Sequence, residues 1–249
     1  SRTIRGAVIS IRENVYLVGC GRTDAGVHAL AHVSHFSLDH PIPCDRILYA
    51  LNCMLPKDIR ILSLSDIPLD FHARYSALRK IYHYHLSFGP SFNPFRRLYT
   101  HHFFTHWDLE KVKKAIPYFI GTHDFTSFAN EAHQGSASRN ATRTLFRLDL
   151  QEESPSLYRL EFEGNGFLYK MVRNIVGTLI DVGFNKIDPE EVPAIFAAKD
   201  RRKGGRTSPA QGLFLVSVLY PIHHTEQNSP LMTQNAEQSP PNTASSLSK

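Results

Sequence analysis

The chain has 249 residues, 42% of them hydrophobic, three cysteines and a formal net charge of +5. This length is enough to bury a sizeable core, as one large domain or two small ones. No stretch approaches the roughly 18–20 consecutive apolar residues of a transmembrane helix, and the first residues do not resemble a signal peptide. The cysteines form no Cys-x-x-Cys pair and indicate free thiols, so we expect a cytoplasmic protein without a membrane association.

Lysine and arginine recur in clusters along the chain. The clusters lie at residues 79–80, 96–97, 139–147 and 201–206. Basic residues on several predicted loops and strands favour a surface that binds phosphates, as in a nucleic-acid-binding protein. A solvated charged surface explains any single cluster equally well.

The first distinctive element is a glycine-rich loop after a short apolar segment. Residues 15–18 predict a short buried strand, and three glycines follow between residues 19 and 26. Glycines allow a positive φ or a close approach to a ligand. Asp24 is a lone carboxylate in this loop, two residues after Arg22, and is a candidate nucleophile or general base. An Asx turn explains the same aspartate without any chemistry.

The loop does not match the known nucleotide-binding patterns. It lacks the Gly-Lys-Ser/Thr ending of a P-loop and the glycine spacing of a dinucleotide-binding motif, so we expect no nucleotide cofactor. Zinc is an alternative, because His28, His32 and His35 would share one face of a helix. Residues 27–38, however, predict mainly a strand, and no Cys-x-x-Cys or His-Glu-x-x-His motif supports a metal. We therefore expect no metal.

A helix and a strand are predicted next. Asp45 is placed to cap a helix that Pro56 would end, and residues 59–64 alternate as in a strand. The apolar face of the helix would consist of Ile47, Leu48, Leu51 and Met54.

Residues 79–88 predict a long strand. Tyr82 lies on this strand, either packed against its neighbours or, in a basic cleft, stacked on a base that has left its helix. With a period of two, one face of the strand would carry Lys80, Tyr82, Tyr84, Leu86 and Phe88.

A helix over residues 108–120 follows, with Gly121 placed to end it. Pro117 lies inside this helix and predicts a kink or an early end. Residues 143–151 and 157–163 both alternate and predict the two strands of a hairpin.

The clearest helix covers residues 167–180, with one continuous apolar stripe. Its opposite face would carry Lys170, Arg173, Asn174 and Thr178. Arg173 is therefore either a solvated cation or a guanidinium directed into a cleft, where it would pair with a carboxylate and keep it ionised.

The last predicted elements are a helix over residues 189–199 and a strand over 213–219. From residue 225 the polar composition indicates a disordered tail. Helices and hairpin-like strands are interleaved without a strict βαβ order, which predicts an α+β fold with mostly antiparallel sheets.

Six motifs occur in a fixed order along the chain. They are Gly-Arg-Thr-Asp-Ala-Gly-Val-His-Ala at 21–29, Phe-His-Ala-Arg-Tyr-Ser-Ala at 71–77, Arg-Lys-Ile-Tyr-His-Tyr at 79–84, Gly-Thr-His-Asp-Phe-Thr-Ser-Phe at 121–128, Phe-Leu-Tyr-Lys-Met-Val-Arg-Asn-Ile-Val-Gly at 167–177 and Thr-Ser-Pro-Ala-Gln-Gly-Leu at 207–213. Together they resemble the TruA family of tRNA pseudouridine synthases.

The resemblance implies an isomerase that converts uridine to pseudouridine at positions 38, 39 and 40, in the anticodon stem-loop of tRNA. Asp24 would be the catalytic residue and would attack ribose C1′ or base C6. Arg173 would pair with Asp24, Tyr82 would stack on the flipped base, and Arg22 would help to hold that base out of the stem. No cofactor or metal would be needed. The family acts as a homodimer with tRNA across both subunits.

The resemblance also implies the pseudouridine synthase fold, in which two α/β subdomains with helix-flanked sheets enclose an active-site cleft. We expect an N-terminal subdomain at 1–75, a C-terminal subdomain at 76–222 and a disordered tail at 223–249. The family's usual first strand, with its Tyr-Asp-Gly, has no counterpart here, so we expect an incomplete first sheet. A second hypothesis is therefore a catalytically impaired tRNA-binding protein, and a third is a metal hydrolase built on the histidines.

Overall fold

The computed structural model describes residues 15–39, 41–130 and 140–221. The predicted tail and the first residues lie outside the described ranges. No helix within those ranges is long and apolar enough to cross a membrane.

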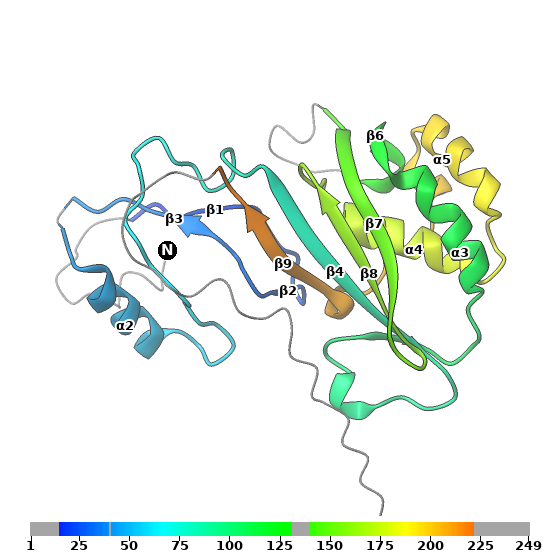
Figure 1. Ribbon diagram of the computed structural model, residues 1–249, viewed down its shortest axis with the longest axis horizontal. Helices are drawn as coiled ribbons and strands as arrows, with labels where there is room; N and C mark the ends of the chain where they lie inside the picture. Colours follow the sequence, from blue (N-terminus) through cyan, green and yellow to red (C-terminus); the bar gives the residue numbers. More distant parts are fainter. Residues whose placement is uncertain (1–14, 40, 131–139, 222–249) are drawn as a thin grey trace, which may run out of the picture.

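A seven-stranded mixed sheet forms the centre of the molecule (Figure 1). Its main path runs in the order β2-β9-β4-β8-β7-β6, and β5 pairs with β4. The strands are β2 (His28–Ala29), β4 (Arg79–Phe88), β5 (His101–Phe103), β6 (Gly121–Asp124), β7 (Thr142–Ser154), β8 (Leu157–Gly164) and β9 (Leu213–Leu219). β2 is parallel to β9 and β5 is parallel to β4, while the other pairs are antiparallel. The predicted α+β fold with mostly antiparallel pairing is confirmed.

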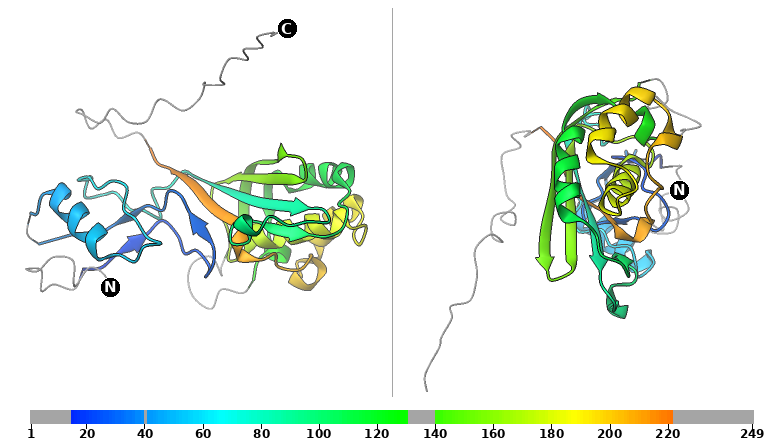
Figure 2. Two further views of the ribbon diagram at one scale, coloured as in Figure 1. Left: turned by 90° about the horizontal axis from the view of Figure 1, so that it is seen from below. Right: turned by 90° about the vertical axis from the view of Figure 1, so that its right-hand side faces the viewer.

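Three helices cover one face of this sheet, as the end-on view in Figure 2 shows. They are α3 (Leu109–Ala115), α4 (Met171–Gly183) and α5 (Val192–Ala198). A smaller lobe at the other end of the molecule contains α2 (Cys44–Met54) and a two-stranded antiparallel sheet of β1 (Val18–Gly19) and β3 (Ser34–His35) (Figure 1).

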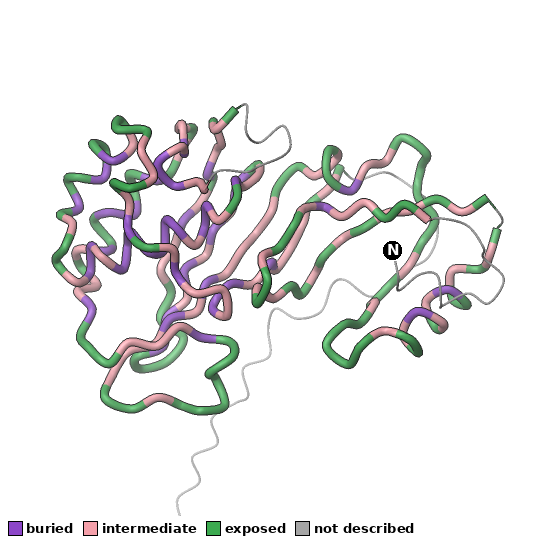
Figure 3. Tube along the Cα trace, turned by 180° about the vertical axis from the view of Figure 1, so that it is seen from behind, coloured by how far each residue is buried: buried purple, intermediate pink, exposed green. Residues whose placement is uncertain are grey.

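The hydrophobic core is divided in the same way. The larger cluster lies between the sheet and α3, α4 and α5, where Figure 3 shows most of the buried chain. The smaller cluster consists of Ile47 and Leu51 of α2 and partly buried neighbours from the same lobe.

Several local predictions are confirmed with small shifts. β4 and β9 have the predicted bounds. α3 ends early, at Ala115, and a 3₁₀ turn over Ile116–Phe119 contains Pro117, as expected for a ring that removes a backbone donor. Gly121 has φ +111° and begins β6.

The small lobe differs most from the predictions. Residues 59–64 form no strand, because the side-chain amide of Asn52 takes the place of a neighbouring strand. Its Nδ2 donates to the Ile61 carbonyl and its Oδ1 accepts from the Ile61 N–H, both at 2.8 Å. Residues 27–38 contain only β2 and β3, each of two residues.

Three further predictions for this lobe are also wrong. Residues 15–18 are not a buried strand, since β1 begins at Val18 and Tyr16 is 82% exposed. The residue before α2 is Pro43, and Asp45 lies in the first turn without capping it. Met54, predicted on the apolar face, is 47% exposed because it is the last residue of α2.

The polar face that we predicted for the clearest helix is also wrong. α4 begins at Met171, after Lys170 in a left-handed conformation, and every residue except Arg173 and Asp181 is buried. Asn174 and Thr178 are buried because residues 204–208 lie across this side of the helix. The approach is so close that a Cβ on Gly177 would lie 1.6 Å from the Arg206 carbonyl oxygen.

Candidate active site

Asp24 lies on the loop between β1 and β2. The loop closes in a tight turn, in which the Val27 N–H donates to the Asp24 carbonyl at 3.1 Å. Gly26 has φ +81°, a conformation that strongly favours glycine. β2 then pairs with β9, so the turn is attached to the central sheet. The carboxylate is consequently held at the junction of the small lobe and the sheet.

The structure brings Asp24 and Arg173 together. Arg173 Nη1 donates to Asp24 Oδ2 at 2.5 Å, and their side chains are 13% and 19% exposed. Arg173 Nε donates to the Ser208 carbonyl at 2.7 Å, and the Ser208 N–H donates to the Arg173 carbonyl at 3.1 Å. The guanidinium is therefore fixed from one side by the backbone and presents its other side to the carboxylate.

A second network supports the segment that holds Arg173. Arg201 Nη2 donates to Asn174 Oδ1, to the Gly205 carbonyl and to Thr207 Oγ1 at 2.8–3.2 Å. Thr207 Oγ1 also donates to Asn174 Oδ1 at 2.7 Å. Asn174 is the residue after Arg173, so these bonds tie the segment before Ser208 to the same turn of α4.

Tyr82 lies on β4 with its ring edge-on to Phe167, at 5.0 Å between centroids. Burial, with smaller contributions from the negative charges of Cys20 and Asp24, raises the pKa of Tyr82 well above its ordinary range. The phenol is therefore neutral at physiological pH and close enough to Asp24 to sense its charge.

Arg22 lies two residues before Asp24 and is exposed. Among the described residues it forms no hydrogen bond or ion pair. The structure does not join it to the Asp24–Arg173 pair, and its guanidinium is open to the solvent.

The sequence analysis did not predict that Cys20, His32 and Lys80 interact next to the Asp24 loop. Burial alone would raise the pKa of the Cys20 thiol, but the hydrogen bond and charge of His32, with smaller contributions from Val33 and Lys80, together lower it. Lys80 Nζ donates to the Cys20 carbonyl at 2.7 Å. The sequence signals for Lys80 were its place in the basic cluster at 79–80 and its position on the same strand face as Tyr82.

The three histidines weighed as a zinc site have separate partners. His28 stacks on Phe214, His32 faces the Gly21 carbonyl, and His35 Nδ1 accepts from the Ala73 N–H. In the described part of the chain, no group of three or more metal-binding side chains is found.

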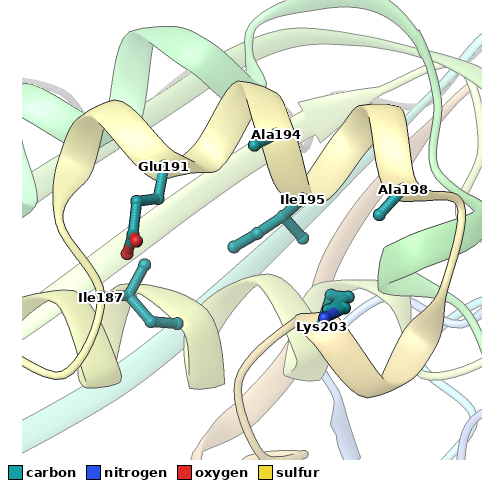
Figure 4. A pocket seen from close by; sticks show the side chains of 6 residues that line it. All are labelled: Ile187, Glu191, Ala194, Ile195, Ala198 and Lys203. Carbon is teal, nitrogen blue, oxygen red and sulfur yellow. The ribbon is translucent and has the colours of Figure 1, made fainter.

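A pocket of about 300 Å³ lies elsewhere, beside α5 (Figure 4). Asp24, Arg173, Tyr82 and Arg22 do not contribute to it. It is lined by Ile187, Glu191, Ala194, Ile195, Ala198 and Lys203.

Comparison with known proteins shows the family to which the chain is related. The family model for tRNA pseudouridine synthase matches residues 2–76 and 115–221. Over 209 residues the chain is 54% identical to tRNA pseudouridine synthase A 1 of Protochlamydia amoebophila, covering 84% of this chain and 81% of that protein. It is 44% identical to tRNA pseudouridine synthase A of Acetivibrio thermocellus, with 84% of each chain covered, and 42% identical to that of Bacillus pumilus, with 84% and 83% covered. The family match, which includes both Asp24 and Arg173, shows that this chain belongs to the tRNA pseudouridine synthase family.

Proposed function

We propose that this enzyme converts uridine to pseudouridine in tRNA and acts at positions 38, 39 and 40 of the anticodon stem-loop. The observation that carries the proposal is the ion pair between Asp24 and Arg173, because it holds one carboxylate in a defined orientation in a chain of this family. A nucleophilic carboxylate must be ionised and correctly directed.

The reaction exchanges one bond of uridine for another. Asp24 attacks the target nucleoside at ribose C1′ or base C6, and the bond between N1 and C1′ breaks. The uracil turns, C5 bonds to C1′ and the bond to Asp24 breaks. The hydrogen on C5 leaves as a proton and N1 takes up a proton, so the product is an isomer of the substrate. All bonds formed and broken belong to the substrate, apart from the transient bond to Asp24, so no cofactor or metal is required.

Three side chains take the supporting roles. Arg173 positions the carboxylate of Asp24. Tyr82 presents its ring to the flipped base, since aromatic rings commonly stack on bases that leave a helix. Arg22, with its open guanidinium, holds the base out of the stem.

The proposal extends to the assembly and its organisation. The chain would act as a cytoplasmic homodimer with tRNA across both subunits. Its N-terminal subdomain would extend over residues 1–75 and its C-terminal subdomain over 76–222, with the site between them. The two separate hydrophobic clusters support this division, and the free Cys20, Cys44 and Cys53 suit a reducing compartment.

The decisive test uses tRNA with tritium at uridine C5. The chain should release tritium into water, and Asp24→Asn should release none while still binding tRNA, because the amide keeps the size of the side chain but not its nucleophilic charge. Asp58→Asn, at an exposed aspartate, is the control and should release tritium at the normal rate.

Full activity of Asp24→Asn would refute the assignment of Asp24. Binding of tRNA without tritium release by the unaltered chain would favour the impaired tRNA-binding protein. No observation among the described residues favours that alternative.

A further inference from the structure

The arginine and lysine side chains on the two faces of the central sheet differ in their ion pairing. On the face away from α3, α4 and α5, each arginine is paired with a glutamate. Arg79 pairs with Glu163 at 2.7 Å, Arg147 with Glu161 at 2.6 Å, and Arg159 with Glu153 at 2.5 Å. These charges are neutralised within the protein, so this face offers little net positive charge.

Lys80 and Arg143 lie on the opposite face. Lys80 faces away from its neighbour Arg79, since side chains alternate along β4. A register shift between Leu145 and Arg147 turns the first part of β7 so that Arg143 lies on the same side as the buried Leu145. Leu145 and Lys80 are both paired with Gly164 of β8, so the two cations are close in the sheet.

No carboxylate among the described residues pairs with Lys80, Arg143 or the nearby Arg74. Burial lowers the pKa of Lys80. The charge of Cys20 opposes this shift, whereas the charges of Arg74 and Arg143 add to it. Burial also lowers the pKa of Arg143, with Arg74 again adding to the effect. Three neighbouring cations without a carboxylate partner form a binding site for an anion.

This cluster lies beside the catalytic loop. Lys80 Nζ donates to the Cys20 carbonyl, and a Cβ built on Gly21 would be 3.5 Å from Nζ. Gly21 precedes Asp24 by only three residues. Arg143 lies along Gly166, where a Cβ would be 3.7 Å from Nε, and Arg74 is exposed.

We propose that Arg74, Lys80 and Arg143 form a binding site for an RNA phosphodiester adjacent to the nucleotide that Asp24 attacks. The inference rests on the proposed function, which brings an RNA strand to Asp24. A phosphodiester has one negative charge and two free oxygens, which suit an ammonium and two guanidinium groups. Holding the backbone there would fix the position of a nucleotide whose base has turned out of the helix.

The first experiment measures tRNA affinity as a function of salt for Arg74→Gln, Arg143→Gln and the double variant. Losing one phosphate contact should lower the slope of log K against log salt by about 1. If affinities converge near 1 M salt, this slope change weakens binding about tenfold at about 0.1 M. Arg79→Gln is the matched control, since Arg79 is already paired with Glu163.

Arg143→Lys keeps the charge and should preserve most of the slope. Arg74 is exposed, so its substitution does not threaten folding, and thermal melting checks the others. The proposal fails if the double variant has the same affinity and slope as Arg79→Gln.

The second experiment locates the phosphate. One methylphosphonate linkage, which is uncharged, replaces the phosphodiester on either side of the target uridine. At the contacted linkage it should weaken binding by the unaltered chain about tenfold, but should not weaken binding by the double variant further. Equal losses for both proteins at both linkages would place the cluster elsewhere on the RNA and overturn the proposal.

Tritium release by the unaltered chain separates the two hypotheses. Release together with unchanged binding by the variants would refute the phosphodiester site alone. A lack of release would refute the proposed function, while the salt slope would still report whether the three cations bind RNA.

Discussion

At the scale of single residues, the site depends on how Arg173 is held. Its guanidinium donates to the Ser208 carbonyl and to Asp24 at the same time. Such a fork has a planar, fixed geometry, which a lysine ammonium lacks. Arg173 is one of only two residues of α4 that are not buried, so its side chain is free to leave the core and reach the loop.

Arg173→Lys should therefore lower turnover by about 100-fold, because a small misplacement of a reacting group costs about that much. Its affinity for tRNA should remain within about twofold of normal, since the positive charge is kept. Single-turnover kinetics at saturating enzyme, with a separate binding measurement, distinguishes the two effects.

Arg202→Lys is the control for this variant. Arg202 is exposed and paired with Asp200, so its turnover should be unchanged. If Arg173→Lys instead loses affinity at normal turnover, Arg173 is a phosphate contact and does not position Asp24.

At the scale of elements, the site depends on the close packing of the segment 204–208 against α4. Two glycines permit this close packing. A Cβ on Gly177 would lie 1.6 Å from the Arg206 carbonyl oxygen, and a Cβ on Gly205 would lie 2.5 Å from the Gly177 carbonyl oxygen. Thr178 Oγ1 accepts from the Gly205 N–H at 2.9 Å. Ser208, which holds Arg173, is the last residue of this packed segment.

Gly177→Ala should destabilise the protein by about 3 kcal/mol or more, although alanine is the better helix former. The added methyl group would push the segment away from α4 and displace Ser208. Turnover should therefore fall more than tRNA affinity. Chemical denaturation measures the first effect and tritium release the second.

Gly204→Ala is the matched control. It has φ −80°, and its added Cβ would approach no atom closer than 3.2 Å. A small change in stability is expected there. Equal destabilisation by both substitutions would show that backbone flexibility, and not the close approach at Gly177, is responsible.

At the scale of the whole molecule, stability is unevenly distributed. α4 is buried on nearly every side within the larger cluster, whereas α2 buries only Ile47 and Leu51. Each large buried apolar side chain contributes about 1.5–3 kcal/mol. The small lobe is therefore held by a much weaker core than the sheet and its helices.

We expect amide hydrogen exchange to be faster in α2 than in α4, with an opening free energy lower by at least about 2 kcal/mol. Mass spectrometry of exchanged peptides measures this directly. Equal protection of the two helices would mean that the lobes open as one unit and would argue against the proposed subdomains.

Much of the fold was predictable from local patterns. The local residue patterns placed β4 and β9 at their observed bounds, and Pro117 predicted a kink or an early end of α3, which ends early. The motifs brought Asp24, Arg173, Tyr82 and Arg22 to attention as candidates. These features depend on residues a few positions apart, whose backbone preferences act within a single element.

Only the tertiary structure decided which segments far apart in the sequence pack and form hydrogen bonds with one another. Asn174 and Thr178 belong to a buried surface because residues some 30 positions later cross α4. Asn52 replaces a strand at Ile61. Alternation alone predicts that Arg79 and Lys80 point to opposite faces. The tertiary structure decided their partners, because it joins Arg79 to Glu163 of β8 and places Lys80 beside the Asp24 loop. The sequence by itself determined which side chains are available, whereas packing across the sheet determined which charges are neutralised.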